Sequence, residues 1–106
     1  MSELTELDGL QLADVLRAGI YRLFEKTDHL NKINVFPVPD GDTGTNMSLT
    51  LSAVLASLDR APEAHAGSML VRAADAALDG ARGNSGAILA QFLLGLGDGA
   101  GHLARL

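Results

Sequence analysis

The chain has 106 residues, a formal net charge of −5 and no cysteine, and 47% of its residues are hydrophobic. That length allows one small domain, here 1–106, and the hydrophobic content argues against disorder. The negative charge argues against binding to nucleic acid or to an anionic membrane surface, since both attract a positive field.

The same numbers bear on the compartment. Without cysteine there is neither a disulfide framework nor a thiolate zinc site, which fits a cytoplasmic protein. The first residues are acidic, whereas a signal peptide begins with positive charge. The most apolar stretch, residues 86–96, is shorter than the roughly 18 residues of a membrane span. We therefore expect a cytoplasmic protein with no membrane span.

Hydrophobic periodicity predicts an all-α fold of about four antiparallel amphipathic helices. The first helix is expected to start at an N-cap, Asp8, and to end near residues 28–30. The second is expected to begin at Thr45 or Asn46, the third to cover 67–81, and the fourth to start within 82–86. Residues 97–106, rich in glycine, are expected to form a flexible tail outside any element. The expected buried faces are Leu12, Val15, Leu16, Gly19, Ile20 and Leu23; Met47, Leu51, Val54, Leu55 and Leu58; Leu70, Ala73, Ala74, Ala77, Leu78 and Ala81; and Leu89, Phe92, Leu93 and Leu96.

The segment 34–47, NVFPVPDGDTGTNM, contains the residues that most clearly indicate a binding site. Its two prolines favour an extended connector rather than a central strand. Asp40 and Asp42 flank Gly41, and carboxylates two residues apart in an extended backbone point the same way. Hard cations such as Mg²⁺ take carboxylate oxygens, with phosphates completing the shell. A magnesium–phosphate site is the favoured hypothesis, and a surface turn that merely caps a helix is the alternative.

Neighbouring residues have two readings each. Asn34 can add an amide oxygen to the metal or close the loop, and Thr43 and Thr45 can meet phosphate or cap the helix. Asn46 and Met47 are weaker candidates, and Met47 is most simply core. The three histidines show no ligand spacing.

The second candidate element is Gly83-Asn84-Ser85-Gly86 at the start of the fourth helix. Glycines allow close backbone approach, and a helix N-terminus favours an anion. An ordinary serine cap with a glycine turn is the alternative. The role of Arg82, phosphate contact or solvent, stays open. A P-loop and a calcium EF-hand are excluded by their missing residues, and the prolines fit poorly with the strand that precedes a dehalogenase-type Asp-x-Asp loop.

The segment 34–47, followed by Ala81-Arg82-Gly83-Asn84-Ser85-Gly86, resembles the nucleotide-binding domain of the dihydroxyacetone-kinase family. The strongest resemblance is to the N-terminal domain of bacterial fatty acid kinases. Dihydroxyacetone kinases themselves carry histidine where this chain has Thr43, which points away from that substrate.

The resemblance implies an eight-helix barrel that holds ATP or ADP with two Mg²⁺ ions at its open end. It implies Asp40 and Asp42 as magnesium ligands, with Asn34 near the place of a third. Thr43, Gly44, Thr45 and Asn46 would lie near the phosphates, and the 83–86 turn would cradle them. It further implies an acyl substrate presented by a separate fatty acid-binding protein.

Four helices correspond to half of such a barrel, so we expect an exposed apolar seam and self-association. Two alternatives stay open. The favoured interpretation is the Mg-ATP-binding part of a kinase that transfers the γ-phosphate to a fatty acid carboxylate; the alternatives are an inactive helical fragment that serves only in association and a subunit of a dihydroxyacetone kinase.

Overall fold

The computed structural model describes residues 6–33, 41–60 and 62–106, and within them the chain is helical with no strand. The helices are α1 (Gly9–Glu25), α2 (Thr27–Lys32), α3 (Thr43–Arg60), α4 (Ala66–Gly80) and α5 (Gly83–Ala100). The predicted all-α class is confirmed. The described residues form five helices rather than about four, because the first expected helix is divided.

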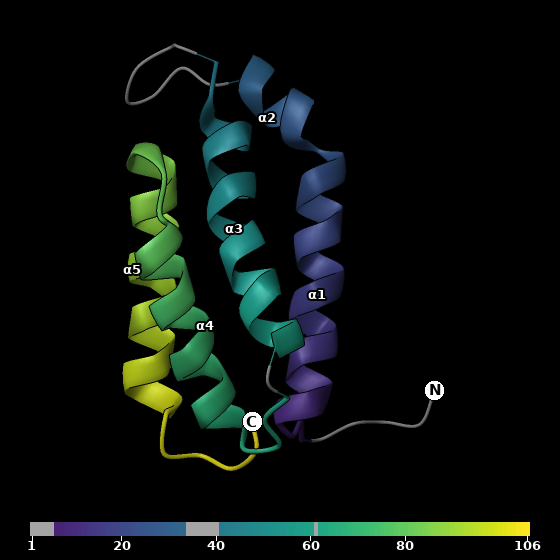
Figure 1. The fold of residues 1–106 in the computed structure, drawn as a ribbon, viewed down its shortest axis with the longest axis vertical. Helices are drawn as coiled ribbons and strands as arrows, with labels where there is room; N and C mark the ends of the chain where they lie inside the picture. Colours follow the sequence, from purple (N-terminus) through teal and green to yellow (C-terminus); the bar gives the residue numbers. More distant parts are fainter. Residues whose placement is uncertain (1–5, 34–40, 61) are drawn as a thin grey trace.

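The four long helices run alternately up and down, and the short α2 lies across the upper end (Figure 1). Helix α3 is central and contacts each of the other four. As a result, α3 and α5 both start at the upper end of the molecule, whereas α1 and α4 start at the lower end (Figure 1).

Helix α1 begins as the sequence predicts. The Asp8 carboxylate accepts a hydrogen bond from the Gln11 backbone N–H at 2.8 Å, and the Gln11 side chain accepts one from the Asp8 N–H at 3.0 Å. This capping box satisfies backbone donors that a helix start leaves unpaired. The expected end at 28–30 is wrong, because α1 stops at Glu25 and the chain turns at Lys26 into α2.

The core lies between α1, α3, α4 and α5. Small residues dominate the buried face of α4, so the neighbouring helices can approach it closely. Five predicted core positions are wrong: Val15, Gly19, Leu78, Phe92 and Leu96 are exposed. The buried apolar side chains are Leu12, Ala13, Ile20, Leu51, Val54, Leu58, Ala66, Met69, Leu70, Ala73, Ala74, Ala77, Ala90 and Leu93.

The glycine-rich C-terminal stretch, residues 97–106, does not form the expected tail outside any element. Helix α5 continues through Gly97 to Ala100, so no tail starts at 97. The last residues are then tied to the lower end of the bundle by backbone hydrogen bonds. Leu103 and Ala104 accept from the first residues of α4, and Leu106 exchanges two hydrogen bonds with Leu7 at 2.7 and 2.9 Å.

None of the helices in the described ranges is long and apolar enough to cross a membrane.

Candidate functional site at the paired starts of α3 and α5

The two stretches that the sequence singles out meet at the upper end of the molecule. The Ser85 hydroxyl, in the first turn of α5, donates a hydrogen bond of 3.4 Å to the backbone carbonyl of Thr43, the first residue of α3. These residues are 42 positions apart in sequence. The up-and-down topology therefore brings together the two segments that were predicted to share one site.

Thr50 joins the same two helices from inside the core. Its side chain is fully buried, at 0% exposure. The hydroxyl donates to the Asn46 carbonyl at 2.8 Å and accepts from the Arg82 backbone N–H at 3.1 Å. A buried hydroxyl with both roles filled fixes the chain entering α5 against the first turns of α3.

The glycines at the start of α5 are explained by this contact. Gly83 has φ +64°, which favours glycine, and a Cβ there would overlap the Asn46 side-chain amide. A Cβ at Gly86 would overlap the Thr50 hydroxyl. The close approach that these glycines allow is thus an approach to α3.

Helix α2 fixes the other side of the α3 start. The Asn31 amide oxygen accepts from the Thr45 backbone N–H at 3.0 Å, and its nitrogen donates to the Thr45 hydroxyl at 2.9 Å. Gly44 lies where a Cβ would overlap the Thr27 carbonyl and crowd Leu30. Gly44 is therefore a packing residue, and Thr45 is held by a partner from a different helix.

Asp42 directly precedes α3 and is half-buried. Its carbonyl accepts the Asn46 N–H at 2.8 Å, the first hydrogen bond of the helix. Gly41 has φ +74°, as expected for a turn between two aspartates. Asn34 and Asp40 lie outside the described residues, as does the proline-containing connector. No three acidic or histidine side chains gather as a metal site within the described ranges, so the metal set stays a prediction.

The other candidate residues differ in their access to solvent. Thr45 and Asn84 are exposed, Thr43, Asn46 and Ser85 are half-buried, and Gly44 and Gly86 are buried. The N-terminal ends of α3 and α5 each carry partial positive charge from the helix dipole. Because both ends lie at one place, their effects add there, and the place suits an anion.

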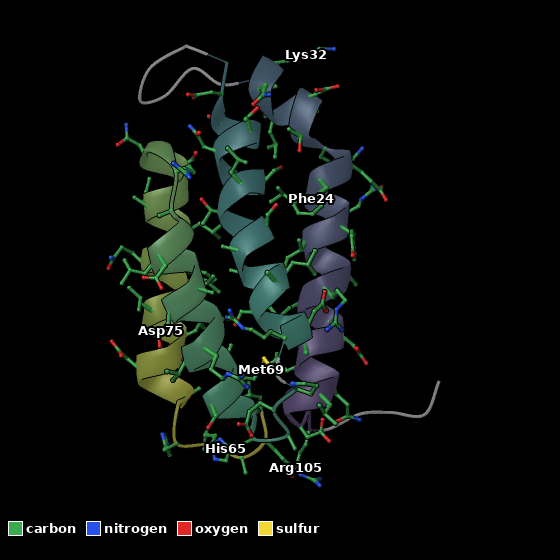
Figure 2. All side chains as sticks on the ribbon, in the orientation of Figure 1. Phe24, Lys32, His65, Met69, Asp75 and Arg105 are labelled. Atoms are coloured by element: carbon green, nitrogen blue, oxygen red, sulfur yellow. The ribbon has the colours of Figure 1, made fainter. Side chains whose placement is uncertain are left out.

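Two hollows flank the site. One, of about 400 Å³, is apolar and is lined by Met47, Ser85, Ile88, Leu89 and Phe92. The other, of about 300 Å³, lies between α1, α2 and α3, where Phe24 points toward α3 (Figure 2). Its remaining lining is Thr27, Thr45, Ser48, Leu49 and Ser52. Each hollow shares one residue with the predicted phosphate site, Ser85 or Thr45.

Sequence reasoning missed Asn31 and Thr50 as parts of this region. Thr50 lies within the apolar face of α3, between Met47 and Leu51, and a threonine in such a position indicates a buried hydroxyl. Asn31 gives no comparable signal, since its partner lies 14 residues away in another helix.

Known proteins resemble this chain over most of its length. Residues 37–105 match the family described as the DAK2 domain. Protein YloV of Bacillus subtilis (strain 168) is 39% identical over 89 residues, which is 84% of this chain and 16% of that protein. An uncharacterised protein of Staphylococcus aureus (strain USA300) is 37% identical over 92 residues, which is 87% of this chain and 17% of the relative.

The chain thus spans about one-sixth of the length of these relatives. The matched region includes Asp40, Asp42 and the start of α5, together with the contacts that join α3 to α5. The chain belongs to the kinase-related DAK2-domain family.

Proposed function

We propose that this chain supplies the Mg²⁺–nucleotide site of an ATP-dependent kinase. The observation that carries the proposal is the hydrogen bond from Ser85 to Thr43, which joins the starts of α3 and α5. Asp42 precedes the start of α3, and the Gly83-Asn84-Ser85-Gly86 turn opens α5. A carboxylate that can bind a metal and amide groups that can donate hydrogen bonds to phosphate therefore lie at one end of the bundle. Membership of a kinase-related family supports the same reading.

The donor set fits magnesium and phosphate. Asp40 and Asp42 would hold the metal, with Asn34 as a further ligand. The resemblance implies two Mg²⁺ ions at this place. Carboxylate and amide oxygens are the ligands that hard cations prefer. Bound Mg²⁺ would neutralise the charge that develops on the β- and γ-phosphates.

The chain's own residues would position the nucleotide. Thr43 and Thr45 offer hydroxyls at the start of α3, with Gly44 and Asn46 beside them, and Asn84 and Ser85 offer side chains at the start of α5. The two helix dipoles favour the phosphate charge. Phosphoryl transfer depends on such placement and charge compensation more than on a protein nucleophile.

The acceptor that we propose is a fatty acid carboxylate held by a separate fatty acid-binding protein, which gives an acyl phosphate. The support is the resemblance of residues 34–47 to fatty acid kinases, together with Thr43 in the place of the histidine of dihydroxyacetone kinases. Dihydroxyacetone is the alternative acceptor, and an inert fragment that only associates is the alternative of another class.

Isothermal titration calorimetry with Mg-ADP and Mg-ATP tests the metal assignment. Asp42→Asn keeps a residue that can begin a helix but removes the carboxylate charge, and we expect it to weaken binding about tenfold or more. Asp75→Asn is the matched control, because Asp75 is exposed on α4, away from the starts of α3 and α5 (Figure 2). Equal affinity of both variants and the wild type would remove Asp42 from the metal site.

A further inference from the structure

The outer face of α5 is an exposed, uncharged surface. It consists of residues at a helical spacing that are all exposed, and two of them are large: Ile88 at 66% and Phe92 at 62%. Within α5 the single charged residue is Asp98, which the 3.6-residue period places at the edge of this face. The α5 outer face comprises Asn84, Ile88, Gln91, Phe92, Gly95 and Gly99.

The face has projections at one end and depressions at the other. Ile88 and Phe92 are four residues apart and project in the first half of α5. Gly95 and Gly99 are also four residues apart, and a Cβ at either would meet nothing within 4 Å. The two large side chains in the first half are thus spaced like the two glycines in the second half, so the projections of one helix could fit the depressions of an identical one.

We propose that two copies of this chain pair through the α5 outer face as an antiparallel, two-fold symmetric dimer. In an antiparallel pair that places Phe92 on Gly95 of the second copy, the same register places Ile88 on Gly99. Symmetry repeats both contacts with the copies exchanged, as a closed interface requires. Glycine on the facing helix lets the two backbones approach closely, so the large side chains are covered.

Charge and shape favour a second copy as the occupant. Each chain carries −5, so a closed pair needs a contact without like charges, and this face provides one. In the stated register Asp98 lies opposite Leu89 of the second copy, far from that copy's own Asp98. In the same register Leu96 of the second copy lies level with Gln91 but on the Leu89 side of α5, where it would enter the 400 Å³ apolar hollow.

Sedimentation velocity over a range of protein concentrations tests the pairing. The wild type should form a dimer and no larger species. Gly95→Gln fills the depression with a polar side chain while improving helix propensity, so we expect dimer dissociation to rise roughly tenfold or more with no fall in the melting temperature of the monomer. Gly19→Gln is the matched control, since Gly19 is exposed on α1 with equally open space.

A dimer that tolerates Gly95→Gln as well as it tolerates Gly19→Gln would overturn the proposal. So would a wild type that stays monomeric at every concentration, as expected if the face binds another kind of partner. A continuous series of oligomers would overturn it as well, because a two-fold contact closes at two copies.

Disulfide formation tests the register, because the chain has no cysteine of its own. In the proposed pair, residue 95 lies about 5 Å along the axis from its symmetry mate, whereas residue 84 lies about 28 Å from its own, at 1.5 Å per residue. Gly95→Cys should therefore cross-link under mild oxidation and Asn84→Cys should not, given the roughly 7 Å limit between Cα atoms. Equal cross-linking at both positions indicates a parallel pair and would refute the antiparallel one.

Discussion

At the scale of single residues, the small and polar side chains decide how α3 meets α5. Gly83 and Gly86 leave room for Asn46 and Thr50, and the Thr50 hydroxyl fills the gap between the two helices with hydrogen bonds in both directions. The same residues that were predicted to approach a phosphate therefore first hold two helix starts in place. A site at that point would have a rigid base.

Thr50→Val tests the importance of this hydroxyl. Valine has nearly the same shape but cannot accept the Arg82 N–H, which would be left without a protein partner. We expect a loss of about 1–3 kcal/mol in the free energy of unfolding, measured with urea. Ser52→Ala is the control, because Ser52 is exposed on the same helix and its hydroxyl donates to the Ser48 carbonyl of the preceding turn. A similar small effect in both variants would contradict the assigned role.

At the scale of elements, the alanine-rich face of α4 determines how closely the helices pack. Ala73, Ala74 and Ala77 are almost fully buried, and α4 packs against α1, α3 and α5. The buried residues of α5 are also mostly small: Gly86, Ala90, Leu93 and Gly97. The larger Ile88 and Phe92 are left on the outer face.

Ala73→Leu should show the cost of separating these helices. Ala73 is at 0% exposure, so the added atoms must displace a neighbour, and we expect a loss of about 1–3 kcal/mol or more in unfolding free energy. Ala56→Leu makes the same change at an exposed position of α3 and should stay within about 0.5 kcal/mol of the wild type. Urea unfolding of both variants measures the difference. A stable Ala73→Leu variant would mean that this part of the core is loosely packed.

At the scale of the whole molecule, the up-and-down order places the candidate site at one end of the bundle and ties the chain end at the other. The backbone hydrogen bonds among Leu7, the start of α4 and residues 103–106 all lie at the lower end. Changes at the upper end, where α3 and α5 start, can therefore be tested without disturbing these contacts.

Thermal unfolding with and without Mg-ATP separates a binding domain from an inert fragment. A ligand that binds only the folded state adds about 2.7 kcal/mol of stability at a hundredfold excess over its Kd, so the melting temperature should rise. ATP with EDTA is the control, since removal of Mg²⁺ should abolish most of the rise. An unchanged melting temperature at millimolar Mg-ATP would favour the fragment that serves only in association.

Local sequence signals predicted much of the fold. Asp8 begins α1, the periodicity of residues 67–81 matches α4 within one residue at each end, and Leu51, Val54 and Leu58 are buried as expected. Periodicity failed for α5 because nearly all sides of this helix are apolar or small, so no single face stands out. The break at Lys26 was missed because its neighbour Thr27 is held by Ser48, 21 residues away.

By itself the sequence determined the all-α class, the starts of α1 and α5, both ends of α4 to within one residue, and the two segments that carry the candidate chemistry. Capping, periodicity and turn residues act over a few neighbours, so a local pattern can show these features. The tertiary structure alone decided that Ser85 meets Thr43, that Asn31 holds Thr45, and which face of α5 is left exposed. These contacts join residues that lie far apart in the chain. They depend on how whole helices pack, which no local pattern encodes.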